Sequence, residues 1–219
     1  MSITLNLKKI KEQLPEHVHL VAVSKTKPVE DLMEAYEAGQ RIFGENKIQE
    51  MTGKWEQLPK DIQWHMIGHV QSNKVKYMAP YVSMIHGVDS LKLLIEIDRQ
   101  AKKHRRVIPC LLQLHIASEE TKFGLNEEEL AVLLNSEELK SLGNIRIWGL
   151  MGMASFTTDE EQIRAEFNYL NSVFEKYRTQ ESENCDFRHL SMGMSSDYKI
   201  AIECGSTIVR IGSTIFGNR

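Results

Sequence analysis

The feature that most constrains the fold is a short apolar segment of strand-like composition that recurs eight times along the 219-residue chain. Most of these segments are followed by residues with apolar side chains at helical spacing. Eight strand–helix alternations with short connections predict a single-domain (β/α)8 TIM barrel over residues 1–219, with a doubly wound open sheet as the alternative. The predicted strands are residues 19–24, 41–46, 63–68, 82–88, 109–116, 145–151, 187–190 and 208–211.

Helix signals between these segments agree with the alternation. Pro28 opens a helix whose first turn contains Glu30 and Asp31, and Gly39 ends it. A short amphipathic helix precedes the first strand and ends at Pro15. Further helix starts are predicted at Ser90, at Asn126 with Glu129, at Thr158 with Glu161, and at Ser195 or Ser196.

Lys25, at the end of the first predicted strand, is the main candidate for chemistry. Val21, Val23 and Lys25 alternate in sequence and therefore share one face of the strand. If that face lines the barrel interior, Lys25 points into a site, where its amine can form a Schiff base with an aldehyde. Lys27 has the same parity, but the following Pro28 favours extended geometry there and places Lys27 at a helix entrance. The alternative is that both lysines are solvated ends of a strand.

Polar residues gather after the predicted strands, whereas the opposite strand ends carry ordinary turn residues. The loops that follow the strands form the site of a barrel enzyme, so this asymmetry predicts a site at that face. The residues concerned are Lys25, Glu45, Asn46, His65, His69, Asp89, Lys122, Met151–Ser155, Ser191–Ser196 and Arg210–Thr214.

The last two strands are followed by residues suited to a phosphate group. Gly212 and Ser213 come after the eighth strand, and Ser191 begins a Ser-Met-Gly-Met-Ser turn after the seventh. Barrel phosphate sites often lie here, where glycine lets backbone N–H groups approach an anion. An imine-forming lysine together with a phosphate site predicts pyridoxal 5′-phosphate as the cofactor. Arg210 keeps its proton, so it could face the ring nitrogen and hold that nitrogen unprotonated.

Other candidate residues have weaker signals. Asn46 is a further candidate contact to the cofactor, and Lys122 could modulate cofactor retention or release unless it is an exposed loop lysine. His65 and His69 are four residues apart, as metal ligands on a helix can be, but they fall at a strand end and lack a convincing third ligand. We expect structural or hydrogen-bonding roles for both histidines. Cys110 lies in an apolar run and is expected in the core.

Composition excludes several classes of protein. A formal net charge of −3 does not suggest a nucleic-acid binder. The three cysteines form no CxxC pair, which favours reduced thiols, and no membrane span or signal peptide is visible. We therefore expect a cytoplasmic protein, and a monomer because no second domain is evident.

Several motifs together resemble the pyridoxal phosphate homeostasis protein family, and the resemblance runs nearly from end to end. It implies a barrel similar to the N-terminal domain of alanine racemase, with Lys25 as the Schiff-base lysine and Arg210 near the ring nitrogen. It also implies phosphate contacts from Ser191, Gly212 and Ser213, and we include Met192 in the site. Position 69 is His where the family usually has leucine. The motifs are residues 21–28, 43–46, 65–68, 71–74, 149–151, 190–195 with Asp197, 209–212 and 216–217.

The resemblance implies a carrier or regulator of vitamin B6 levels rather than a turnover enzyme. Racemisation needs a second acid or base opposite the lysine, and no tyrosine falls at a predicted strand end. The expected role is to hold pyridoxal 5′-phosphate on Lys25 and release it to apo-enzymes that depend on it. An amino-acid racemase is the alternative, with His65, Lys122 or a residue of another subunit as the second acid. A third reading is a barrel that binds some other phosphate ester, with Lys25 as a simple cation.

Overall fold

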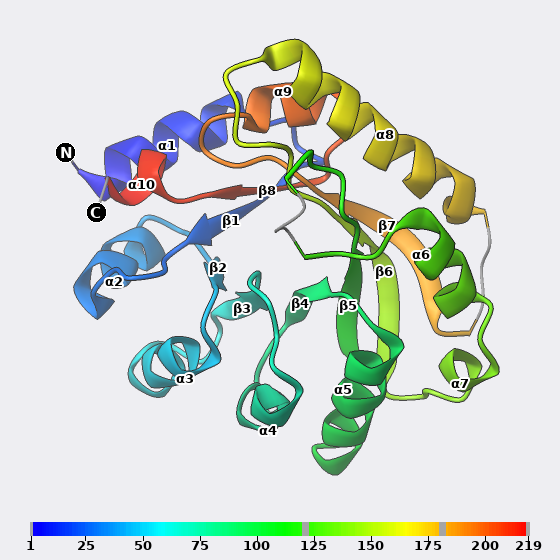
Figure 1. Cartoon of the computed structure of the whole chain (residues 1–219). Helices are drawn as coiled ribbons and strands as arrows, with labels where there is room; N and C mark the ends of the chain where they lie inside the picture. The colour runs from blue at the N-terminus through cyan, green and yellow to red at the C-terminus, as the bar shows by residue number, and fades with distance from the viewer. Residues whose placement is uncertain (1, 120–122, 180–182, 218–219) are drawn as a thin grey trace.

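The protein is a closed barrel of eight parallel strands surrounded by helices (Figure 1). The computed structural model describes residues 2–119, 123–179 and 183–217. Strand β8 pairs with β1 through the His19–Ile208 and Ala22–Ile211 registers, which closes the sheet. The barrel prediction is therefore confirmed and the open sheet is wrong. The strands are β1 His19–Val23, β2 Ile42–Glu45, β3 Gln63–Met66, β4 Met84–Val88, β5 Ile108–Gln113, β6 Ile145–Met151, β7 Cys185–Ser191 and β8 Ile208–Ile211.

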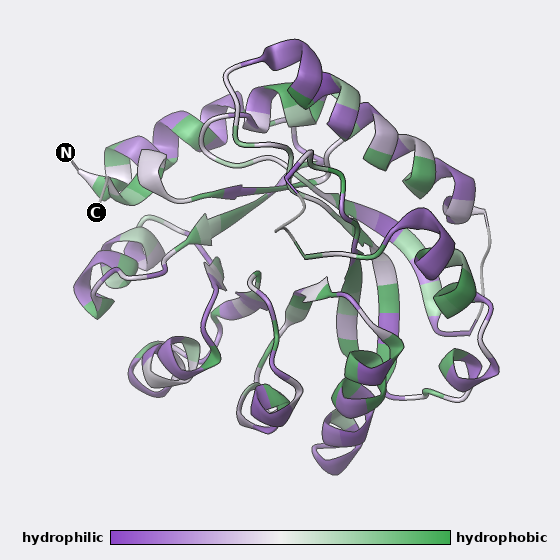
Figure 2. Cartoon of the chain, viewed as in Figure 1, coloured by the Kyte–Doolittle hydropathy of each residue, from purple (hydrophilic) through white to green (hydrophobic). Residues whose placement is uncertain are grey.

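Helices follow the strands and cover the outside of the barrel (Figure 1). Figure 2 shows hydrophilic and hydrophobic stretches on the same helices, as expected when one face packs on the sheet and the other meets solvent. No helix among the described residues is long and apolar enough to cross a membrane. The helices are α1 Ile3–Gln13, α2 Val29–Glu37, α3 Ile48–Gln57, the 3-10 helix η1 Ser72–Lys74, α4 Val75–Met78, α5 Leu91–Lys103, α6 Glu127–Leu134, α7 Glu137–Lys140, α8 Glu160–Arg178, α9 Tyr198–Glu203 and α10 Ser213–Phe216.

The apolar core has two parts, and in β1 these parts separate the residues by parity. Leu20 and Ala22 of β1 belong to the large cluster between sheet and helices, whereas Val21 belongs to a smaller cluster inside the barrel. Alternate strand residues point to opposite faces, so the Val21 face continues through Val23 toward the barrel mouth. This is the face on which the sequence placed Lys25. The other buried members of the inner cluster are Met84, Leu111, Met151 and Ile208.

Two helix starts are as predicted. Ser90 accepts a hydrogen bond from the backbone N–H of Leu93, and Asn126 and Glu129 form a capping box before α6.

Two other predicted helix starts are wrong. The long helix α8 is capped by Asp159 rather than Thr158, because the Asp159 carboxylate accepts the N–H groups of Glu161 and Gln162. Helix α9 begins after Asp197 rather than at Ser195 or Ser196. The Asp197 carboxylate accepts the N–H of Met194 and thereby closes a turn that keeps residues 194–197 out of the helix.

Candidate functional site

A cavity of about 610 Å³ opens at the carboxyl ends of the strands, within the size range of small-molecule sites. Five of the seven residues proposed from the sequence line it, and they come from different ends of the chain. Ser191 and Met192 do not line it, because both are fully buried behind the cavity wall. The five lining residues are Lys25, Asn46, Arg210, Gly212 and Ser213.

Lys25 occupies a tight turn directly after β1. The backbone N–H of Lys27 donates to the Ser24 carbonyl oxygen at 3.1 Å and closes this turn. Lys25 is half-buried beside Val23 in the cavity wall, and its ammonium has no hydrogen-bond or ion-pair partner in the part of the chain that the structure describes. Lys27 differs, since its ammonium donates to the carbonyl oxygens of Phe216 and Gly217 at 3.1 and 3.0 Å. The turn therefore offers Lys25 to the cavity while Lys27 holds the C-terminal segment.

Arg210 lies at the base of the cavity and is almost completely buried. Its Nη1 donates to Ser191 Oγ at 2.6 Å and its Nη2 donates to the Gly152 carbonyl oxygen at 3.1 Å. Burial lowers the pKa of Arg210 to about 10, with the charge of Asp197 acting in the opposite direction. The guanidinium is therefore still protonated at neutral pH, and it is a fixed positive charge facing the cavity.

A chain of hydrogen bonds runs from Arg210 into the barrel interior. Ser191 Oγ lies 2.9 Å from His86 Nδ1, and His86 Nε2 lies 2.9 Å from His65 Nδ1. Arginine can only donate, so the Ser191 hydroxyl accepts from Arg210. Which atom donates in the two contacts of His86 depends on the tautomer of its ring. The chain links the Arg210 guanidinium through Ser191 to both interior histidines.

Both histidines of this chain are held neutral. Burial, assisted by the charges of His189 and His19, lowers the pKa of His65 to about 3. Burial also lowers the pKa of His86 well below its ordinary value. The sequence reasoning missed His86, although it follows the interior residue Met84 at strand parity in β4. A hydrogen-bonding role for His65 agrees with these contacts.

Hydroxyl groups gather on the wall formed by the ends of β7 and β8. Ser195, Ser196 and Ser213 line the cavity, and Ser195 Oγ accepts the backbone N–H of Gly212 at 3.2 Å. A side chain at position 212 would place its Cβ only 3.0 Å from the Val23 carbonyl oxygen, so glycine permits this close packing. The Ser-rich turn after β7 thus contributes Ser195 and Ser196 to the wall, and Ser191 supports Arg210 from behind.

The mouth of the cavity is partly aromatic. Phe123 and the highly exposed Phe156 line it, and His69 stacks on Phe123 with ring centroids 4.2 Å apart. His69 Nδ1 also lies 3.3 Å from an Asp89 carboxylate oxygen. His69 therefore sits at the mouth while His65 is deep in the barrel, and no group of three metal-ligating side chains occurs among the described residues. Lys122 lies outside the described residues.

Two further residues singled out from the sequence, Glu45 and Cys110, are buried and do not line the cavity. Glu45 does not line the cavity; it is fully buried on the side of the sheet that faces α3, against Lys54. Cys110 is buried in the core as expected, and burial raises the pKa of its thiol. Cys185 and Cys204 are also buried.

Comparisons with known proteins identify relatives over the whole chain. Residues 2–219 match the family model for the alanine racemase N-terminal domain. The pyridoxal phosphate homeostasis protein of Aquifex aeolicus is 40% identical over 201 residues, covering 91% of this chain and 86% of that protein. The Homo sapiens protein of the same name is 41% identical over 210 residues, covering 91% of this chain and 76% of that protein.

Solved structures show the same fold. PipY from Synechococcus elongatus, without pyridoxal phosphate, has a TM-score of 0.92 at 35% identity, covering 98% of this chain and 100% of that one. The same protein with pyridoxal phosphate bound has a TM-score of 0.88. An alanine racemase from E. faecalis shares the fold at 17% identity and a TM-score of 0.72, covering 100% of this chain and 58% of that one. The chain therefore belongs to the pyridoxal phosphate homeostasis protein family, a group of barrels that resemble the N-terminal domain of alanine racemase.

Proposed function

We propose that this protein binds pyridoxal 5′-phosphate as a Schiff base on Lys25 and acts in vitamin B6 homeostasis as a carrier without turnover chemistry. The observation that carries the proposal is the half-buried Lys25 amine, which has no partner among the described residues and faces a cavity that also contains Arg210. Imine formation requires an accessible amine, and the charged guanidinium suits a ring nitrogen that stays unprotonated.

The remaining lining residues fit the other groups of this cofactor. Ser195, Ser196 and Ser213 supply hydroxyl donors for a phosphate near the close-packed Gly212. Asn46 Oδ1 is buried without a hydrogen-bond partner in the described residues, so its amide is available to a polar ring substituent. The presence of pyridoxal phosphate in PipY, at 35% identity, supports the same cofactor here.

The cavity wall also supports a carrier over a racemase. Racemisation moves protons on both faces of the substrate carbon and therefore needs a second acid or base near Lys25. No tyrosine lies among the described residues that line the cavity, and His69 is engaged with Asp89 and Phe123 at its mouth. A protein of this kind would retain a reactive aldehyde and deliver it to apo-enzymes. We propose that it does so as a monomer in the cytoplasm.

Absorbance and peptide mapping test the cofactor assignment. Purified protein mixed with pyridoxal 5′-phosphate should show an imine absorbance band, and borohydride reduction should place the adduct on Lys25. Lys25→Ala should abolish both signals, whereas Lys47→Ala, at an exposed lysine on the neighbouring loop, should leave them intact. An adduct spread over surface lysines in the unmodified protein would contradict the proposal.

A deuterium exchange assay separates the carrier from the racemase. The protein loaded with cofactor is incubated in heavy water with L-alanine and other amino acids, and deuterium at the α-carbon is measured. A carrier should give exchange no faster than free pyridoxal 5′-phosphate does. Exchange that is much faster and disappears in Lys25→Ala would favour the racemase.

A further inference from the structure

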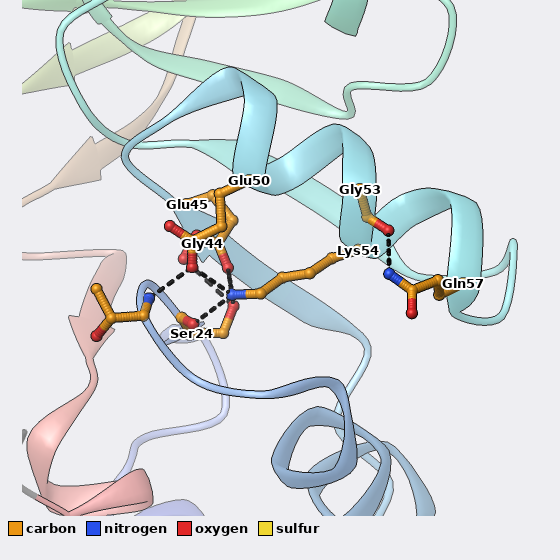
Figure 3. A network of polar contacts seen from close by, with 8 residues as sticks. Ser24, Gly44, Glu45, Glu50, Gly53, Lys54 and Gln57 are labelled. Carbon is orange, nitrogen blue, oxygen red and sulfur yellow. Dashed lines mark hydrogen bonds and ion pairs between the residues drawn. The ribbon is translucent and has the colours of Figure 1, made fainter.

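A buried charged cluster of Lys54, Glu45 and Glu50 contacts Ser24, the residue before Lys25 (Figure 3). The Lys54 ammonium of α3 donates to Glu45 Oε1, to Glu50 Oε1 and to the carbonyl oxygen of Ser24, each at 2.7 Å. Ser24 Oγ also donates to Glu45 Oε1 at 2.7 Å. All three protons of the ammonium therefore have an acceptor, and one of these acceptors is the backbone of the residue before Lys25.

Lys54 and Glu45 of the cluster are almost completely buried. The Lys54 side chain is 7% exposed and that of Glu45 is 0% exposed. Removing two ions from water has a large free-energy cost, and an apolar pair of similar volume is often equally stable in such a buried position. Burial raises the pKa of Glu45, against hydrogen bonds from Lys54 and Ser24 that lower it. The buried ion pair therefore adds little to the stability of the fold. Its contacts with the backbone around Lys25 are the more informative feature.

The residue after Lys25 is held by the same cluster. Thr26 has φ +63°, in the left-handed region that β-branched residues rarely adopt. Its backbone N–H donates to Glu50 Oε1 at 2.6 Å, the oxygen that also accepts from Lys54. Ser24 and Thr26 are therefore both tied to one buried ammonium, directly or through Glu50.

We propose that Lys54 is a positioning residue that, with Glu50, holds the backbone on both sides of Lys25 and so sets the accessibility of the Lys25 amine and its affinity for the aldehyde. The proposal rests on the proposed function for the identity of the aldehyde. It concerns a lysine that does not line the cavity and that acts only through the turn.

The first test measures the turn and the amine without cofactor. Lys54→Met and Glu50→Ala should each speed hydrogen exchange of the Thr26 amide by about tenfold or more, the factor expected for one lost charge-assisted hydrogen bond. They should also change the rate at which an acylating reagent labels Lys25 relative to Lys47 in the same molecule. Lys140→Met, which removes an exposed ion pair with Glu137, is the matched control and should change neither rate.

The second test measures the affinity for pyridoxal 5′-phosphate. Both variants should weaken imine formation on Lys25 by about tenfold or more. Thr26→Gly should restore much of the affinity of Glu50→Ala, since glycine adopts φ +63° without a side-chain penalty. If Lys54→Met fails to fold, the comparison of Glu50→Ala with the double variant Glu50→Ala and Thr26→Gly still tests whether the turn controls the affinity of Lys25.

Two outcomes would overturn the proposal. One is faster Thr26 exchange with unchanged labelling of Lys25, because the turn would then not control the amine. The other is equal loss of affinity in Glu50→Ala with and without Thr26→Gly, which would indicate general destabilisation. If unmodified protein forms no Lys25 adduct with the cofactor, the proposed function fails, while the exchange and labelling rates still decide the role of Lys54.

Discussion

At the scale of single residues, Ser191 shows how position in the fold changes a role read from sequence. It was a candidate phosphate contact, yet its hydroxyl accepts from Arg210 and lies within hydrogen-bond distance of His86 Nδ1, behind the cavity wall. Ser195 and Ser213 line the cavity itself. These positions predict two different roles. Ser195 and Ser213 can contact a phosphate directly, whereas Ser191 supports Arg210.

The affinity for pyridoxal 5′-phosphate and for pyridoxal, which lacks the phosphate, distinguishes these roles. Ser191→Ala should weaken both ligands by a similar factor, about tenfold, because a buried guanidinium N–H and His86 Nδ1 each lose a partner. Ser213→Ala should weaken pyridoxal 5′-phosphate alone. A Ser191→Ala effect confined to the phosphorylated ligand would show that Ser191 reaches the phosphate.

At the scale of elements, the contact between β6 and β7 depends on one glycine. Gly149 has φ +139°, and a Cβ there would lie 1.9 Å from the His189 carbonyl oxygen, a backbone atom that cannot move cheaply. Gly149 is also where the register between β5 and β6 and between β6 and β7 shifts. Glycine at this position permits the irregular strand that keeps the barrel closed.

Gly149→Ala should lower the free energy of unfolding by roughly 3 kcal/mol or more, because it adds backbone strain to a steric clash. Gly53→Ala is the matched control, since Gly53 lies inside α3 and an added Cβ would meet no atom within 4 Å beyond its chain neighbours and the backbone of its own helix. That variant should raise the free energy of unfolding by up to about 1 kcal/mol. Urea denaturation measures both, and equal effects of the two substitutions would refute this account of Gly149.

At the scale of the whole molecule, buried neutral histidines predict sensitivity to acid. The pKa values of His65 and His189 are lowered by burial to about 3 and about 4, and that of His86 is also lowered. Between about pH 6.5 and pH 4 the unfolded chain binds protons at these histidines and the folded chain does not. Stability is therefore present above pH 6.5 and is lost as the pH falls toward the folded-state values.

The free energy of unfolding should fall by about 1 kcal/mol per pH unit for each such histidine across this range. Urea denaturation at several pH values measures the slope. His65→Gln should reduce the slope even if it lowers stability at pH 7, whereas His104→Gln removes an exposed imidazole and serves as the control. A slope unchanged in His65→Gln would contradict the assignment.

Much of the fold followed from local patterns in the sequence. The predicted strands differ from the observed ones by at most three residues at either end, because each strand is a short apolar run bounded by turn residues. The parity of Val21, Val23 and Lys25 identified the interior face of β1 and the residue at its end. The exceptions were two helix starts. Asp159 caps α8 in place of Thr158, and the Asp197 carboxylate closes the turn that precedes α9.

The sequence by itself determined the alternation of strands and helices and the lysine delivered to the barrel mouth, since both depend on residues near one another in the chain. Only the tertiary structure decided which polar groups meet. Closure of the barrel brings Ser191 of β7 beside Arg210 of β8 and His86 of β4, and packing of α3 brings Lys54 beneath the Lys25 turn. These three contacts join residues that are 19, 105 and 30 positions apart in the chain. Their geometry depends on the shear and closure of the whole sheet, which no local pattern contains.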